Sequence, residues 1–102
     1  MKYGITEFQY QQIIKVFANY REVESAILYG SRAKGCHKPY SDIDITLVGN
    51  SIDLSLLQKI EIELDDLILP YKFDISSYKS IENINLLEHI ERVGKEIYRR
   101  EN

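Results

Sequence analysis

The segment from Asp42 to Val48 alternates in character from one residue to the next. In an extended chain, successive side chains point to opposite faces. One face would then carry Ile43, Ile45 and Leu47, and the other would carry Asp42, Asp44, Thr46 and Val48. This alternation predicts a half-buried β-strand, which Gly49 and Asn50 bring to an end. Any fold of this chain must therefore bury one face of the strand and leave two carboxylates on the other.

The remaining patterns predict helices and strands around this strand. Helical periodicity and capping residues predict helices, and short apolar runs predict strands. The expected order is a helix at 6–20, strands at 25–29 and 42–48, a helix at 53–68, a strand at 71–76 and a helix at 81–100. The last helix would bury Ile84, Leu87, Ile90, Val93 and Ile97. This order implies an α/β (α+β) fold in which a small mixed β-sheet is packed with helices.

Length and charge narrow the class of protein. The 102 residues suffice for one compact domain, expected over 1–102, and are too few for two. The net charge of -3 argues against a general nucleic-acid binder, which would carry a basic face. No apolar run is long enough to cross a membrane, and the N-terminus lacks an export signal. The single cysteine fits a reducing compartment, so a cytoplasmic location is expected.

Asp42 and Asp44 are candidates for metal binding. Because they lie two residues apart on a predicted strand, they project from the same face, with Cα atoms about 6.5 Å apart. Carboxylates so placed repel each other unless a positive charge lies between them, and a hard cation such as Mg²⁺ prefers carboxylate oxygens. The alternative is the solvated end of a strand, which short acidic motifs often represent.

Gly30 and Ser31 follow the strand predicted at 25–29 and suit phosphate binding. A tight turn presents backbone N–H groups to an anion, and glycine lets the backbone approach it closely. Arg32 and Lys34 could contact phosphate oxygens. An ordinary turn remains the alternative, but the carboxylate pair that follows shortly after the turn favours phosphate binding.

Asp74 is a third candidate carboxylate, in the middle of the strand predicted at 71–76. Aspartate is disfavoured within strands, so its position requires an explanation. If this strand neighbours that of Asp44, the side chain can join a two-metal site for phosphoryl transfer or accept a proton from an attacking hydroxyl. The alternative is an aspartate on an edge strand that faces water.

The chain resembles a known family in these residues. Gly30-Ser31 followed by Asp42-Ile43-Asp44 is similar to the signature of minimal nucleotidyltransferases in the DNA polymerase beta superfamily. The string LYGSRAKG…SDIDITLVG resembles the stand-alone microbial members, which are commonly encoded beside a helical HEPN partner as antitoxin and toxin. The similarity covers essentially the whole chain.

The resemblance implies a palm-like nucleotidyltransferase fold and a division of roles. Nucleotide binding would fall to Gly30, Ser31 and Arg32. Catalysis and the binding of Mg²⁺, as two ions, would fall to Asp42, Asp44 and Asp74. ATP would be the donor, and AMP would pass to a tyrosine hydroxyl of the HEPN toxin and silence it. No direct contact with nucleic acid and no membrane association are expected, because the net charge is negative and no apolar run is long enough to span a bilayer.

Two alternative functions remain open. The protein could neutralise its partner by contact alone, with a nucleotide site that no longer catalyses, or it could transfer the nucleotide to a small-molecule hydroxyl. Among the remaining residues, Tyr29 and Tyr40 flank the motif loop, where one of them could stack on a base. His89 is expected to be a structural or surface histidine of the last helix.

Overall fold

The fold was analysed in a computed structural model that describes residues 2–101. Its helices are α1 (Glu7–Ala18), α2 (Ser31–Lys34), α3 (Leu54–Asp65), the 3₁₀ turn η1 (Tyr78–Ser80) and α4 (Ile84–Val93). Its strands are β1 (Ser25–Tyr29), β2 (Ile43–Val48), β3 (Phe73–Ser77) and β4 (Lys95–Arg99). The predicted α/β class, with a small mixed sheet packed with helices, is confirmed.

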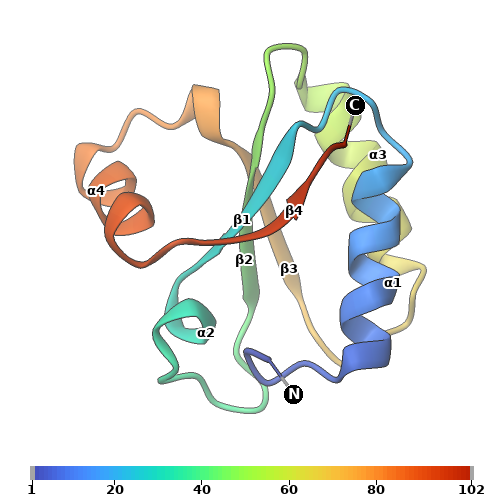
Figure 1. The fold of residues 1–102 in the computed structure, drawn as a ribbon, viewed down its shortest axis with the longest axis vertical. Helices are drawn as coiled ribbons and strands as arrows, with labels where there is room; N and C mark the ends of the chain where they lie inside the picture. Colours follow the sequence, from blue (N-terminus) through green and yellow to red (C-terminus); the bar gives the residue numbers. More distant parts are fainter. Residues whose placement is uncertain (1, 102) are drawn as a thin grey trace.

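The strands form one mixed sheet in the order β3-β2-β1-β4. β1 pairs antiparallel with both β2 and β4, and β3 joins the other edge of β2 in parallel. α3 connects the two parallel strands, as a crossover connection requires. Figure 1 shows α1 and α3 on one side of the sheet and α4 on the other. The sheet therefore has a fully covered face and a partly covered one.

The main hydrophobic core lies between the sheet and the helices α1 and α3. The alternating residues Ile43, Ile45 and Leu47 of β2 are buried there, as their pattern predicted. They meet Phe17 of α1 and Ile60 of α3, both with no exposed surface. Burial of this face fixes the register of β2, because a slip by one residue would turn its carboxylates into the core.

Side-chain caps define where the longer helices begin. The hydroxyl of Thr6 accepts from the N–H of Gln9, whose side chain accepts from the N–H of Thr6 in return, so the two residues form a capping box. Asp53 caps α3 by accepting from the N–H of Leu56. Across residues 2–101, none of the helices combines the length and the apolar character needed to cross a membrane.

The prediction of a single helix over 81–100 is wrong in its extent. The chain forms a helix only over Ile84–Val93 and then continues as β4, which occupies an edge of the sheet. Ile84 was expected in the core but is 75% exposed, whereas Ile90 is buried. Ile97 packs against the core from a strand and not from a helix.

Gly94 explains the change from helix to strand. Its N–H donates to the carbonyl of Ile90 and closes the last turn of α4, while its extended backbone (φ -61°, ψ 144°) starts β4. A Cβ at this position would collide with that carbonyl and with the side chain of Ile27 on β1. The absence of a side chain at residue 94 thus lets the chain leave the helix and pair with β1 directly.

Candidate active site

The turn after β1 holds two of the residues predicted to bind nucleotide. Gly30 follows the last residue of β1 with φ 79°, in the left-handed region that favours glycine, and α2 begins at Ser31. The carbonyl of Gly30 accepts from the N–H of Lys34, and no side chain caps α2. The first turn of α2 therefore presents its backbone donors and the Ser31 hydroxyl at the end of β1.

Gly30 also lies directly against a carboxylate. A Cβ built on Gly30 would overlap Oδ2 of Asp44, which belongs to β2. The contact follows from the pairing of the strands, because Asp44 is the partner of Tyr29, the residue before Gly30. The structure thus brings the predicted phosphate turn and one predicted metal ligand together, and only glycine fits between them.

Asp44 and Asp74 are direct neighbours across the sheet. They are paired in register on the parallel strands β2 and β3, so their Cα atoms are about 4.8 Å apart and their side chains share a face. Asp42 immediately precedes β2 and lies two residues from Asp44. Asp42 and Asp74 are exposed, and Asp44 is half-buried. The three carboxylates therefore gather on the partly covered face of the sheet, beside the turn.

The crowding of carboxylates changes the protonation of Asp44. The pKa of Asp44 is raised from 3.8 to about 6, mainly by burial and then by the charges of Asp74 and Asp42, while the charge of Arg32 lowers it. The site therefore holds more negative charge than its surroundings compensate. A bound cation would relieve this repulsion, which is the chemical requirement for a metal site built from carboxylates.

As they lie, the three carboxylates are not arranged to surround a metal ion. Among the side chains of residues 2–101, no three His, Cys, Asp or Glu residues are arranged to hold a metal ion. The donor type suits a hard cation such as Mg²⁺, which retains several water ligands and needs only one or two protein carboxylates. The exposure of Asp42 and Asp74 leaves room for their side chains to change rotamer. In their chemistry, the residues fit the metal.

Arg32 lies in a position that the sequence did not indicate. Its side chain is only 1% exposed, and its guanidinium donates to the carbonyls of Tyr3, Pro39 and Ser41 at 2.8–3.2 Å. The same group stacks over the ring of Tyr71, 4.8 Å from its centre. This buried side chain holds the loop after α2 to the N-terminal segment, and as it lies it does not reach out to a phosphate.

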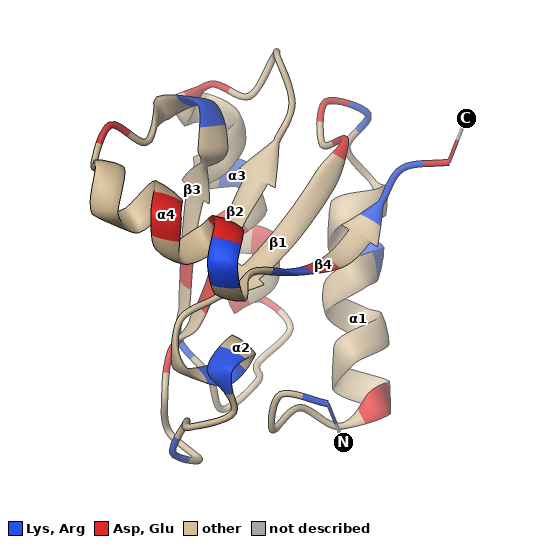
Figure 2. Ribbon diagram, turned by 60° about the vertical axis from the view of Figure 1, so that its left-hand side comes forward, with Lys and Arg blue, Asp and Glu red and all other residues tan. Residues whose placement is uncertain are grey.

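The positive charge of this region is nevertheless close to the carboxylates. Figure 2 shows basic residues on α2 next to acidic residues at the neighbouring ends of the strands. Lys34 is exposed, and the charge of Arg32 lowers the pKa of Asp44. An incoming triphosphate would therefore meet a cationic turn beside an anionic pair.

Two further residues border the site. The N–H of Gly30 donates to Nε2 of His89 on α4, at 3.1 Å. The ring of His89 also meets that of Tyr29 edge-on, with centres 6.2 Å apart. Burial raises the pKa of the Tyr29 hydroxyl, and the nearby charges of Asp74 and Asp44 add to this effect. His89 was expected only as a structural or surface residue, and no motif in the sequence pointed to its contact with the turn.

A sequence model of the family described as "Polymerase beta, Nucleotidyltransferase" matches residues 11–102, which include the turn and all three carboxylates. The chain belongs to this nucleotidyltransferase family. The family match confirms the resemblance to nucleotidyltransferases of the polymerase beta superfamily. It supports the activity of a nucleotidyltransferase.

Solved structures share the fold at low sequence identity. A toxin–antitoxin structure with AMP-PNP superposes with TM-score 0.73 at 20% identity, over 90% of this chain and 74% of that one. An MNT antitoxin in complex with a tri-AMPylated HEPN toxin from Shewanella oneidensis gives 0.68 at 19%, over 92% and 72%. A candidate nucleotidyltransferase from Sulfolobus solfataricus gives 0.53 at 20%, over 98% and 90%. No curated protein matches the chain. At these identities the likeness establishes the fold alone.

Proposed function

We propose that this protein is a Mg²⁺-dependent nucleotidyltransferase that moves AMP from ATP to a hydroxyl group of a partner protein. The observation that carries the proposal is the contact between Gly30 and Asp44, with Asp74 in register beside it. This arrangement places a phosphate-binding turn against paired carboxylates on one face of a sheet. The proposed unit is the single minimal domain of residues 1–102.

The residues of the turn would bind the triphosphate. The Ser31 hydroxyl and the N–H groups of the first turn of α2 are donors that suit the β- and γ-phosphates. Arg32 would act indirectly, because its hydrogen bonds fix the loop that follows α2 and its charge favours ionised Asp44. Lys34, which is exposed, is better placed than Arg32 for a direct contact with phosphate.

The carboxylates would hold the metal and manage the proton. Asp42, Asp44 and Asp74 would bind Mg²⁺, which when bound neutralises the charge that develops on the phosphate oxygens. A new bond forms between the acceptor oxygen and the α-phosphorus, and the bond from that phosphorus to the oxygen of the leaving pyrophosphate breaks. Asp74 would take the proton of the attacking hydroxyl and, being exposed, release it to water.

The proposed acceptor is a tyrosine of a helical HEPN-type toxin, which the transfer of AMP would silence. Support comes from the shared fold with an MNT antitoxin that was solved together with a tri-AMPylated HEPN toxin. In this role the protein acts as an antitoxin by modification.

Labelled nucleotides test the proposal. The protein is incubated with Mg²⁺, one of the four labelled ribonucleoside triphosphates, and the helical protein encoded beside it. We expect label from ATP on a tyrosine of the partner, and loss of that label in Asp44→Asn and Asp74→Asn. Asp65→Asn, an exposed aspartate at the end of α3, is the matched control and should behave as the wild type. Neutralisation of the partner that persists in Asp44→Asn would show action by contact and overturn the proposal.

A further inference from the structure

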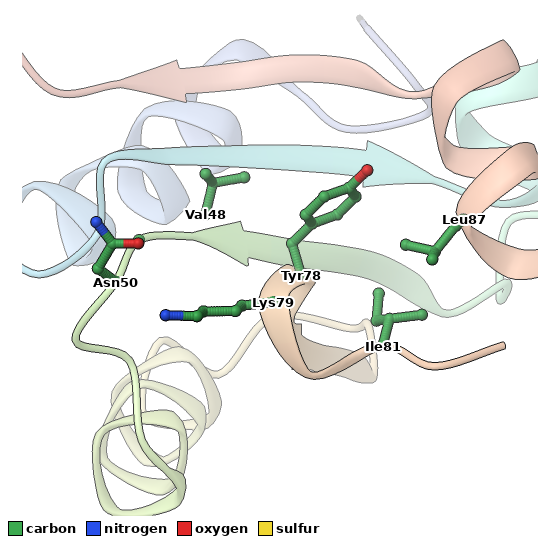
Figure 3. A pocket seen from close by; sticks show the side chains of 7 residues that line it. Val48, Asn50, Tyr78, Lys79, Ile81 and Leu87 are labelled. Carbon is green, nitrogen blue, oxygen red and sulfur yellow. The ribbon is translucent and has the colours of Figure 1, made fainter. Parts of the chain in front are cut away.

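A hollow of about 460 Å³ lies on the same face of the sheet as the carboxylates. Its lining comes from three parts of the chain: the end of β2, η1 with the segment after it, and α4. The lining residues are Val48, Gly49, Asn50, Tyr78, Lys79, Ile81 and Leu87. Figure 3 shows the Tyr78 ring between Val48 and the pair Ile81 and Leu87, with Lys79 and Asn50 together at one end.

The position of the hollow relative to the carboxylates follows from β2. Asp44, Thr46 and Val48 alternate onto one face of this strand, so Asp44 and the edge of the hollow lie about 13 Å apart along it. Asp44 pairs with Tyr29 at the end of β1 that leads into the turn, whereas Val48 pairs with Ser25 at its beginning. The phosphate turn and the hollow therefore lie at opposite ends of the carboxylate face.

The geometry of nucleophilic displacement at phosphorus determines from which side the acceptor must approach. The attacking and leaving oxygens stand on opposite sides of the phosphorus, roughly in line. If the turn holds the leaving pyrophosphate, the acceptor must approach from the far side of the carboxylates, where the hollow lies. In an extended segment the Cα atoms of a tyrosine and of the second residue after it are about 6.6 Å apart, and a tyrosine side chain that leans along the segment brings its hydroxyl up to about 13 Å from that residue.

We infer that this hollow is the docking site for the acceptor polypeptide. It binds two groups of that polypeptide, an apolar side chain close to the modified residue and a neighbouring carboxylate. The inference rests on the proposed function and adds the chemistry of its substrate. Val48, Tyr78, Ile81 and Leu87 are apolar or aromatic, yet all are partly exposed and lie outside the buried core cluster. They offer an anchoring surface for an aliphatic side chain.

The rim of the hollow selects the charge of the partner. Lys79 is an exposed cation toward the same end of the hollow as Asn50 in the view of Figure 3. In a chain whose net charge is -3, a lysine beside an apolar surface favours an acidic segment over a basic one. The occupant is therefore a polypeptide in which leucine-like and acidic residues lie next to each other, close to the acceptor tyrosine.

Synthetic peptides test the inference without relying on catalysis. The probe is the capped hexapeptide Gly-Tyr-Gly-Leu-Glu-Gly, and its two relatives carry Ser for Leu or Lys for Glu. Binding is followed by amide shifts of ¹⁵N-labelled full-length protein with Mg²⁺ and a non-hydrolysable ATP analogue. We expect the first peptide to shift the amides of Val48, Asn50 and Leu87, and the two relatives to bind about tenfold more weakly.

Matched variants make the test specific. Leu87→Asp and Lys79→Glu should each weaken the first peptide about tenfold, and Lys79→Glu should bind the lysine peptide better than wild type does. Ile84→Asp, exposed on the same helix but outside the hollow, and Lys59→Glu on α3 are the controls and should change binding less than twofold. All four variants should keep the wild-type affinity for the ATP analogue.

Three results would overturn the inference. The first is the absence of amide shifts around the hollow at about 5 mM peptide. The second is equal peptide binding by the Leu87→Asp and Ile84→Asp variants. The third is a loss of affinity for the ATP analogue in Leu87→Asp, which would assign the hollow to the donor nucleotide. Label transfer is measured in parallel samples that contain labelled ATP in place of the analogue. Peptide bound at the hollow without any transfer would support the docking site and contradict the proposed function, so the two can fail separately.

Discussion

The N–H of Gly30 donates to Nε2 of His89, which lies 3.1 Å away on α4. This hydrogen bond joins residues 59 positions apart in the sequence and ties α4 to the turn proposed to bind phosphate. For Nε2 to accept this hydrogen bond, the imidazole must carry its ring proton on Nδ1. His89 thus fixes the orientation of one peptide group in the turn before any nucleotide arrives.

Replacing His89 should loosen the turn. His89→Phe keeps a ring against Tyr29 but leaves the Gly30 N–H without its acceptor, at a cost of about 1–2 kcal/mol in the free energy of unfolding. His89→Gln retains an acceptor of similar reach and should lose less. Urea unfolding measures the stability, and hydrogen exchange at the Gly30 amide reports the bond itself. Equal exchange rates in Phe and Gln variants would contradict this role.

Gly30→Ala should disable the site more severely than any neighbouring glycine change. The new Cβ would overlap Oδ2 of Asp44, and the backbone at φ 79° is strained for alanine. We expect about 2–3 kcal/mol of destabilisation and loss of ATP-analogue binding by calorimetry. Gly35→Ala is the matched control, because it has φ 82° but open space around it, and should cost only about 1 kcal/mol.

The C-terminal region shows where sequence patterns were insufficient. Ile90, Val93 and Ile97 satisfy helical spacing, so periodicity extended one helix across them. The same residues are compatible with a helix end followed by a short strand, and only Gly94 separates the two interpretations. Glycine marks helix ends, but a Cβ at residue 94 would collide with Ile27 on a distant strand as well as with the carbonyl of Ile90, and no local pattern reveals the contact with Ile27.

The placement of the three carboxylates follows strand geometry, which a sequence pattern can predict. The alternation of β2 placed Asp42 and Asp44 on one face, and the structure pairs Asp74 with Asp44 across the sheet. Side chains whose partners are backbone carbonyls escaped prediction. A charged residue in a motif loop suggests a ligand, yet the guanidinium of Arg32 is occupied by carbonyls that only tertiary folding brings together.

Substitutions of Arg32 distinguish the structural role from direct phosphate binding. Arg32→Lys cannot reproduce the planar set of bonds to Tyr3, Pro39 and Ser41 and should lower the free energy of unfolding by about 2 kcal/mol. Lys34→Ala, at an exposed position on α2, should change it by less than about 0.5 kcal/mol but weaken ATP-analogue binding. An Arg32→Lys variant with wild-type stability and poor nucleotide binding would instead indicate a direct contact.

The stability of the metal-free protein should depend on the protonation of Asp44. Its pKa is raised from 3.8 to about 6, so the folded state holds this proton more tightly than the unfolded state does. The stabilisation is complete below pH 3.8 and is lost as the pH rises through about 6. Asp44→Asn cannot ionise and should therefore gain stability over the wild type at pH 8.

Urea unfolding in the presence of a chelator measures that gain. We expect about 1–2 kcal/mol at pH 8, after allowance for the screening of a half-buried carboxyl by solvent, and a smaller gain at pH 4.5. Asp65→Asn is the control and should show no such dependence on pH, because it lies outside the cluster. The same gain at both pH values would mean that ionisation of Asp44 is not the source of the effect.

Mg²⁺ should reverse the order of stability of these proteins. A cation that binds the folded state alone raises the free energy of unfolding by about 2.7 kcal/mol at one hundred times its Kd. At pH 8 the wild type should therefore gain Tm as MgCl₂ is added, whereas Asp44→Asn and Asp74→Asn, each lacking one carboxylate of the in-register pair, should gain little. Differential scanning calorimetry measures the Tm of each protein. NaCl at equal ionic strength is the control, because it screens charges without binding specifically. A wild-type Tm that rises equally with both salts would contradict a metal site at this pair.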